Sequence, residues 1–341
     1  MDNFIKYVNI KNFKSIADLE LWDCKRINLF IGYPNVGKSN VLEALGLFSL
    51  PYLNEGENLS KLVRVENMNE LLHNLSDTFC SVETNLEKME LSSSSLKIYR
   101  EISNGKVNYI FSKELDLLDR KIECYDCGQD EYCADGGNIM RYIFQSKNHW
   151  KPSNENILLP PYGENIVSVL ARNFGDFSSE DRKMNEWIEN ELRKNNLEYV
   201  LDMSSHTIKS QKRLGVGRVR TLPYTSFADT LQRVIFYKTA IASNKNSVLL
   251  FEEPEAHAFP PYIRNITQDI VDAKTNQFFI VTHSPFVTND FLEHEHLRRE
   301  TSIYLFDYKN DQTTVKRLTD EEMDEVYEYG MDLFFNLESF L

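Results

Sequence analysis

Residues 32–39, GYPNVGKS, have the types and spacing of a phosphate-binding loop. Gly32, Gly37, Lys38 and Ser39 match G-x-x-x-x-G-K-[S/T], a pattern whose backbone N–H groups wrap a chain of phosphates. The lysine of this pattern reaches the β- and γ-phosphates, and the hydroxyl holds Mg²⁺. The sequence therefore predicts a site for ATP and Mg²⁺, with Lys38 also acting in catalysis. A glycine-containing turn without a ligand is the alternative interpretation.

The elements on either side of the loop support a nucleotide. Residues 26–31 form a short apolar run typical of a strand, and residues 39–48 have apolar positions at helical spacing. A helix that begins at the loop points its free N–H groups and partial positive charge at the bound anion. The residues that we predict to bind the nucleotide here are Gly32, Pro34, Asn35, Val36, Gly37, Lys38, Ser39 and Asn40.

A second group of candidate residues follows the apolar run at 247–251. Glu252 and Glu253 come directly after it, where the strands of α/β sheets deliver ligand-binding groups. Phosphoryl transfer needs one carboxylate in the Mg²⁺ shell and another that positions the attacking water. We predict that Glu252 serves the metal and Glu253 the water. The alternative is an acidic first turn of a helix, which the helix dipole favours in any case.

A third apolar run, at 276–281, ends in Thr282, His283 and Ser284. An imidazole at the end of this strand could donate a hydrogen bond to a γ-phosphate oxygen. A single histidine at a strand end is often structural, but this chain also has a phosphate loop and a pair of glutamates. We therefore predict a catalytic role for His283.

A helix is expected within residues 224–237. Ser226 and Asp229 fit the pattern [S/T]-x-x-[D/E] that starts many helices. In the simpler interpretation Ser226 caps the helix. In the other, Ser226 at this helix N-terminus binds the γ-phosphate of a nucleotide held by a second subunit.

Three of the five cysteines, Cys124, Cys127 and Cys133, fall within ten residues. Thiolates at this spacing could hold Zn²⁺, with His149 as a candidate fourth ligand. No second C-x-x-C pair follows, and the segment is rich in Asp, Glu and Gly, which favours free thiols in an inserted loop. The odd number of cysteines and the absence of a secretion signal argue against a disulfide framework.

The formal net charge of −14 disfavours a generally basic surface for nucleic acid. Residues 206–220 nevertheless carry five cations and no acid. A solvated pair of strands is the favoured interpretation of this stretch, and a patch that contacts phosphates, for example those of DNA, is the other. No segment has the length and apolarity of a membrane span or a signal peptide, so we expect a cytoplasmic protein without a membrane partner.

The remaining pattern predicts an α/β protein whose two halves are separated by an insertion. Residues 1–112 carry the phosphate loop and antiparallel strands, including a hairpin that turns at 103–105. Residues 113–205 form an inserted helical and loop region, and residues 206–341 contain the glutamate pair and the histidine.

Taken in order, these motifs resemble the AAA-type ATPases of the ABC/SMC superclass. The likeness is to RecF-like ATPases and to the ATPase domains of overcoming-lysogenisation-defect (OLD) nucleases. Residues 32–39 resemble their Walker A motif, residues 249–257 their Walker B motif and residues 281–284 their switch histidine. The resemblance implies an ABC-type P-loop fold with a central, mostly parallel sheet, an antiparallel β subdomain and an inserted region.

The family likeness also implies a function. It implies an ATPase that dimerises, or forms a higher oligomer, around ATP, in genome maintenance or defence against phage, with a separate effector protein. Residues 224–230 lack the glycines of the family's signature loop, so the choice between Thr225 and Ser226 as the phosphate contact stays open. The alternative from another class is a nucleotide-dependent assembly scaffold that hardly hydrolyses ATP. A small-molecule kinase is a further alternative, against which the glutamate pair and the histidine argue.

Overall fold

The computed structural model of the protein describes residues 3–53, 59–74, 79–92, 95–102, 105–111, 124–125, 137–172 and 179–341. The chain divides into two compact units. The first comprises residues 1–141, 246–253 and 275–341, and the second comprises residues 142–245 and 254–274.

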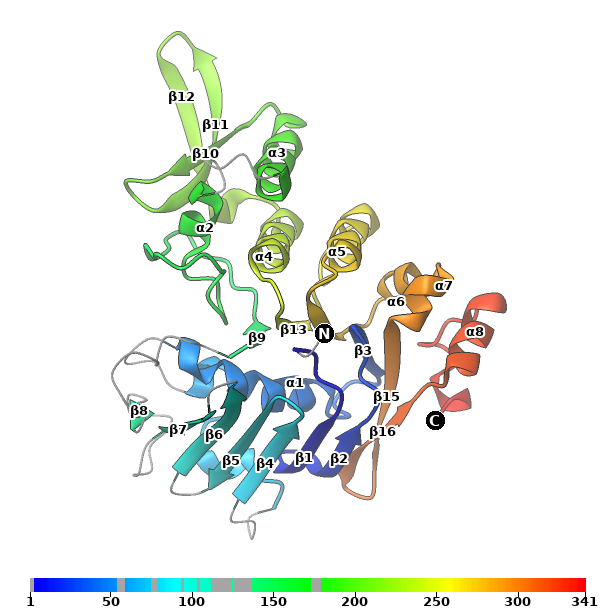
Figure 1. Cartoon of the computed structure of the whole chain (residues 1–341). Helices are drawn as coiled ribbons and strands as arrows, with labels where there is room; N and C mark the ends of the chain where they lie inside the picture. Colours follow the sequence, from blue (N-terminus) through cyan, green and yellow to red (C-terminus); the bar gives the residue numbers. More distant parts are fainter. Residues whose placement is uncertain are drawn as a thin grey trace. The chain divides into compact units, whose positions relative to one another are not determined.

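The first unit is built around a six-stranded sheet in the order β16-β15-β3-β14-β13-β9. Figure 1 labels β3, β9, β13, β15 and β16 of this sheet. Its central strands β3, β13, β14 and β15 run parallel, and β16 is antiparallel to β15. Both β3 and β14 are buried along their whole length, as the continuous apolar runs predict. The bounds are β3 (Ile27–Gly32), β9 (Ile139–Tyr142), β13 (Val248–Glu252), β14 (Gln277–Val281), β15 (Thr301–Lys309) and β16 (Gln312–Arg317).

A second, antiparallel sheet of the first unit has the order β2-β1-β4-β5-β6-β7-β8. The predicted hairpin around 103–105 is confirmed, because β6 and β7 pair antiparallel from Leu96↔Phe111 to Ile102↔Gly105. The strands are β1 (Val8–Phe13), β2 (Ile16–Leu21), β4 (Phe79–Thr84), β5 (Glu87–Ser92), β6 (Ser95–Ile102), β7 (Gly105–Phe111) and β8 (Cys124–Tyr125).

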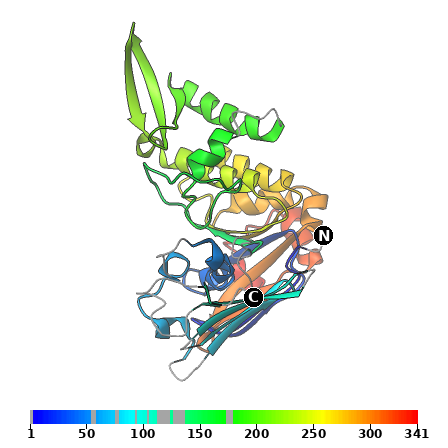
Figure 2. The same cartoon turned by 60° about the vertical axis from the view of Figure 1, so that its left-hand side comes forward.

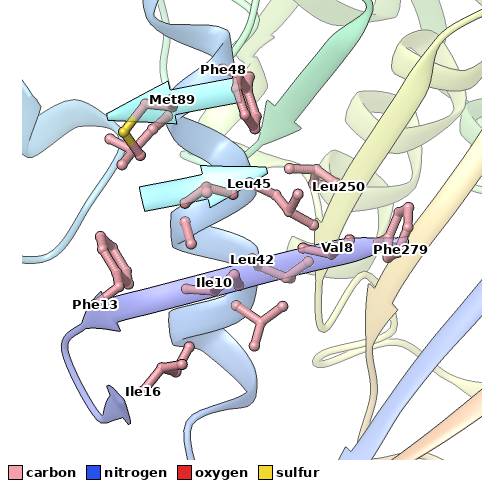
Figure 3. Close-up of a cluster of buried hydrophobic side chains, with 14 of the residues drawn as sticks. Val8, Ile10, Phe13, Ile16, Leu42, Leu45, Phe48, Met89, Leu250 and Phe279 are labelled. Atoms are coloured by element: carbon pink, nitrogen blue, oxygen red, sulfur yellow. The ribbon is translucent and has the colours of Figure 1, made fainter. Parts of the chain in front are cut away.

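Helix α1 (Lys38–Gly46) joins the cores of the two sheets. Figure 3 shows Leu42 and Leu45 of α1 among Val8 and Ile10 of β1 and Leu250 of β13, all of them fully buried. Burying each such side chain contributes about 1.5–3 kcal/mol. The helix that starts at the phosphate loop is thus held on both sides by apolar packing. A 3₁₀ segment, η1 (Leu47–Tyr52), continues the chain from its end.

Short helices complete the first unit. Helix α6 (Pro285–Leu292) follows β14, and α7 (Glu295–Arg299) leads into β15. Helix α8 (Asp320–Glu328) begins with a capping box in which Thr319 and Glu322 satisfy each other's backbone N–H groups. The 3₁₀ turns η2 (Leu59–Lys61) and η3 (Met68–Leu71) lie between η1 and β4, and η5 (Leu337–Ser339) follows α8.

The second unit combines helices with a three-stranded sheet in the order β10-β11-β12. The strands are β10 (Glu198–Asp202), β11 (Thr207–Gly215) and β12 (Arg218–Pro223). The helices are α2 (Ile166–Arg172), α3 (Ser179–Arg193), α4 (Asp229–Ser243) and α5 (Pro260–Asp272), with the 3₁₀ turn η4 (Tyr224–Ser226) before α4.

The predicted cap of α4 is wrong. The helix begins at Asp229 with Ala228 as its N-cap and no side-chain cap, and Ser226 lies in η4. Phe227 is extended and buried, with its ring 5.3 Å from that of Tyr224. Because this packing holds the chain extended up to Ala228, the helix starts later than the sequence pattern suggests.

The α/β fold class, with its mostly parallel sheet and antiparallel part, is confirmed. Within the parts of the chain that the structure describes, no helix is long and apolar enough to cross a membrane.

Candidate functional site

The phosphate loop connects β3 to α1 inside the first unit, and two of its positions require glycine. Gly37 has a φ of +100°, and a Cβ there would lie 2.0 Å from Oγ1 of Thr313. A Cβ on Gly32 would lie 2.5 Å from the carbonyl oxygen of Phe306. Both glycines therefore let the loop pass close to β15 and β16.

The hydroxyl groups of Ser15 and Thr313 lie next to Gly37 and belong to a small hydrogen-bond network. The Oγ of Ser15 lies 2.6 Å from Oγ1 of Thr313, and the amide of Asn40 donates to Ser15 Oγ over 2.7 Å. Asn40 thus supports the loop through its side chain. Its predicted contact with the nucleotide, like those of Pro34, Asn35 and Val36, stays a prediction.

Lys38 is 5% exposed, and its Nζ donates to the carbonyl oxygens of Gly32 and Tyr33, each over 2.7 Å. Burial lowers the pKa of Lys38 to about 8, although the negative charges of Glu253 and Glu252 act in the opposite direction. The side chain therefore lies folded along the loop, where a phosphate chain would offer stronger acceptors than the two carbonyl groups.

Glu252, the last residue of β13, meets the first turn of α1. Its Oε1 accepts a hydrogen bond from Ser39 Oγ over 2.5 Å, so the two predicted metal ligands face each other. Arg64 donates to the same oxygen over 3.1 Å, and Arg141 donates to Oε2 over 2.9 Å. Burial would raise the pKa of Glu252, but the charges of Arg141 and Arg64 and the Ser39 hydrogen bond hold it below its usual value.

Behind Glu252 lies a second carboxylate that sequence reasoning missed. Glu43 of α1 is fully buried and pairs with Lys14 and with Nε of Arg64, the latter over 2.7 Å. Arg141, 3% exposed on its side chain, lies 3.9 Å from Glu43 as well. Arg64 and Arg141 therefore each contact both carboxylates. The available signal for this network was a Glu among the apolar residues of the predicted helix, five residues after the loop lysine.

Arg141 has room because of a glycine in α1. A Cβ on Gly46 would lie 2.6 Å from Cδ of Arg141. The guanidinium also donates to the carbonyl oxygen of Leu62. No motif marks Arg141, because it lies 111 residues before its partner Glu252.

Glu253 and His283 form the other side of the site. The backbone N–H of Glu253 donates to the carbonyl oxygen of Val281, the last residue of β14, and Glu253 has a φ of +45°. Its Oε1 lies 3.6 Å from Nε2 of His283. Burial and the nearby charge of Lys38 lower the pKa of His283, and Glu253 raises it in part. The imidazole is therefore neutral at neutral pH.

The structure thus brings together five of the predicted residues at the carboxyl ends of β3, β13 and β14, all within the first unit. They are Lys38, Ser39, Glu252, Glu253 and His283. Ser226 belongs to the second unit, and its predicted phosphate contact stays a prediction.

The side chains of the cysteines proposed for Zn²⁺, Cys124, Cys127 and Cys133, lie outside the described residues. His149 is exposed. Within the described ranges, no group of three or more His, Cys, Asp or Glu side chains could hold a metal ion.

The donor set fits a nucleotide with Mg²⁺. The hydroxyl of Ser39 and the carboxylate of Glu252 are hard oxygen ligands, which Mg²⁺ binds together with substrate phosphates. The N-terminus of α1 and the buried cation of Lys38 attract negative charge to the same place. The arrangement therefore has the groups that binding of a phosphate chain with Mg²⁺ requires.

The chain is similar to known proteins in part of its sequence and in its fold. A family model described as "AAA domain, putative AbiEii toxin, Type IV TA system" matches residues 135–289, a range that includes Glu252, Glu253 and His283. A comparison of the sequence with curated proteins finds no significant match.

Two solved structures share the fold over nearly the whole chain. One is an SMC head bound to the C-terminal winged-helix domain of ScpA, which is 14% identical with a TM-score of 0.51 and covers 94% of this chain and 99% of its own. The other is an Smc head domain with an extended coiled coil, bound to the C-terminal domain of ScpA derived from Pyrococcus furiosus. It is 12% identical with a TM-score of 0.51, and the match covers 96% of this chain and 99% of that one.

Proposed function

Because the chain carries an AAA domain of the ABC/SMC-like P-loop ATPase type, we propose that it hydrolyses ATP to ADP and phosphate as a molecular switch. The observation that carries this proposal is the convergence of Lys38, Glu252 and Glu253 at the ends of neighbouring strands. These groups come from segments more than 200 residues apart, and phosphoryl transfer needs each of them.

Each side chain has a separate part in the proposed reaction. Lys38 leaves its two carbonyl partners and donates to the phosphates, and Ser39 and Glu252 hold Mg²⁺. When bound, the Mg²⁺ would neutralise charge on the β- and γ-phosphate oxygens. Glu253 orients the attacking water and accepts its proton, and His283 donates a hydrogen bond to the terminal phosphate.

We further propose that the chain dimerises around ATP and acts with a separate protein. Both SMC heads named above were solved with a domain of ScpA bound, which supports a partner for this chain. The description of the matching family, which mentions a toxin of a toxin–antitoxin system, supports a role in defence. Ser226 or Thr225 of one copy would contact the nucleotide of the other.

Replacement of Glu253 by Gln tests the proposal. The amide keeps the shape of the side chain but cannot accept the proton of the water, so ATP binding should persist while turnover falls about 10²–10⁴-fold. Binding is measured with a fluorescent ATP analogue, and turnover is measured as phosphate release.

The matched control is Glu295→Gln on α7, where the carboxylate is 73% exposed and should be dispensable. Turnover near the wild-type rate in Glu253→Gln would show that the water is positioned by another group. A wild-type protein that binds ATP but releases no phosphate would favour the assembly scaffold instead.

A further inference from the structure

The ribbon formed by β11 and β12 extends beyond the third strand of its sheet. Strand β10 pairs with β11 only from Glu198↔Gln211 to Asp202↔Thr207, whereas β11 and β12 stay paired as far as Gly215↔Arg218. Residues 212–220 therefore form a two-stranded ribbon, which Figures 1 and 2 both show as an extended hairpin. We call these residues the basic ribbon.

The basic ribbon is exposed on both of its faces. Every residue from 212 to 220 is exposed, including the aliphatic side chains of Leu214 (57%), Val216 (103%) and Val219 (55%). Gly215 and Gly217 flank Val216 with positive φ, and a Cβ at either would touch nothing. A two-stranded hairpin alone is marginally stable in water, so this one has apolar surface and backbone edges available for a partner.

Three of the four cations in the basic ribbon, Lys212, Arg218 and Arg220, are uncompensated. Lys212 lies directly opposite Arg220, so their side chains share a face, and Arg218 follows on that face because it precedes Arg220 by two residues. Like charges in opposed positions destabilise a sheet. None of the three cations has an ion pair with any residue that the structure describes.

Two other cations of the sheet, one of them within the basic ribbon, differ in this respect. Lys209 pairs with Asp202 over 2.7 Å, and Arg213 pairs with Glu198 over 3.0 Å. Both acids belong to β10, whose pairing with β11 ends at Glu198↔Gln211. The strand therefore does not extend alongside the three unpaired cations. The free positive charge is therefore confined to the part of the ribbon that leaves the sheet.

Charged residues also protect the edges of sheets against aggregation. Protection of a sheet edge explains single lysines, but it does not explain the exposed aliphatic side chain of Val216 at the tip of the ribbon. A basic stem with an aliphatic tip fits a polyanion that offers apolar groups between its phosphates, as the thymine methyl groups do in the DNA major groove.

We propose that the basic ribbon binds double-stranded DNA. The DNA major groove is about 12 Å wide and about 8.5 Å deep and admits a two-stranded ribbon. Four residues of a strand span about 14 Å, enough to enter it. The major groove of duplex RNA is too narrow for this. In the complex with DNA the phosphates are contacted by Lys212, Arg218 and Arg220, and the base edges are contacted by Val216. These contacts must outweigh the repulsion between DNA and the rest of the chain, whose formal net charge is −14.

The test compares the full-length wild type with the triple variant Lys212→Glu, Arg218→Glu, Arg220→Glu. Binding to a short labelled DNA duplex is followed by fluorescence anisotropy between about 50 and 200 mM salt. The affinity of the triple variant should be at least about tenfold lower. The slope of log affinity against log salt concentration should become less steep by about 2.7, because each lost phosphate contact removes about 0.9 from this slope. Val216→Ser should weaken binding without changing the salt dependence.

The matched control reverses three exposed cations elsewhere, Lys6→Glu, Lys11→Glu and Lys151→Glu, with the same change of net charge. Circular dichroism verifies that each variant folds. DNA binding that survives in the ribbon variant, or falls equally in the control, would overturn the proposal. So would equal affinity for an RNA duplex, or binding to anionic vesicles but not to DNA.

Discussion

The first unit contains a network of two carboxylates, Glu43 and Glu252, and two guanidinium groups, those of Arg64 and Arg141. Arg64 and Arg141 each contact both Glu43 and Glu252, but their surroundings differ. The side chain of Arg141 is 3% exposed and that of Arg64 is 66% exposed. Because solvent screens an exposed ion pair, the two arginines should contribute very differently to stability although they have the same partners.

Arg141→Met should therefore destabilise the protein far more than Arg64→Met. The first variant leaves Glu252 without its buried cation, and of its buried cations Glu43 keeps only Lys14, whose side chain is 12% exposed. Removal of one partner from a buried ion pair costs about 3–5 kcal/mol. The second removes an exposed cation and should cost about 1 kcal/mol or less. Urea unfolding of both variants measures the difference. Equal losses would show that the network is solvated and that Arg141 is not its main cation.

His283 provides a test of the electrostatics of the site. Burial and the charge of Lys38 hold its pKa below the ordinary value of 6.5, with Glu253 opposing them in part. The folded protein thus binds this proton less readily than the unfolded chain. The stability that this contributes is complete above pH 6.5 and is lost as the pH falls through the folded-state pKa.

We expect the ring protons of His283 to titrate below pH 6.5 in a nuclear magnetic resonance titration of the nucleotide-free protein. The His283→Gln variant assigns the resonance. In Lys38→Met the midpoint should rise, since one of the two causes of the lowered pKa is then absent. A midpoint above 6.5 in the wild type would mean that Glu253 dominates over burial.

At the scale of elements, the strands that end at the site could be predicted, and the network beneath it could not. β3, β13 and β14 are buried on both faces, so they appear in the sequence as apolar runs with abrupt polar ends. Arg141 and Arg64 reach Glu252 from 111 and 188 residues away, and neither follows a motif. The start of α4 was mispredicted because Phe227 packs against Tyr224, a tertiary contact that overrides a local capping pattern.

Two cysteines of the first unit, Cys80 in β4 and Cys24 between β2 and β3, should react slowly with thiol reagents. Cys80 on β4 is fully buried, and burial raises its pKa to about 12. Burial likewise raises the pKa of Cys24 to about 12, although Tyr304 donates to its sulfur over 3.4 Å. At pH 8 only about one such thiol in ten thousand is ionised, and the thiolate is the reactive form.

Iodoacetamide at pH 8 should therefore leave Cys24 and Cys80 unmodified in the native protein and label both in urea. Peptide mass spectrometry follows each cysteine separately. The urea sample is the control for detection of both peptides. Rapid labelling of native Cys80 would show that β4 opens readily.

At the scale of the whole molecule, the two proposed interactions respond to salt in opposite ways. Each copy carries a formal net charge of −14, so two copies repel each other at long range, and salt screens this repulsion over about 10 Å at 0.1 M. DNA binding through the basic ribbon instead releases counterions and weakens as salt rises. The two associations can therefore be distinguished by salt alone.

The Glu253→Gln variant should accumulate as a dimer when ATP and Mg²⁺ are present, because it binds ATP but hydrolyses it very slowly. Raising salt from about 50 to 200 mM should increase the dimer fraction, since screening reduces the repulsion between the two acidic copies. Light scattering coupled to gel filtration measures the mass, and the same variant with ADP is the control. A dimer that dissociates as salt rises would indicate that attractive charge pairs hold the interface, and a mass that never changes with ATP would contradict dimerisation around the nucleotide.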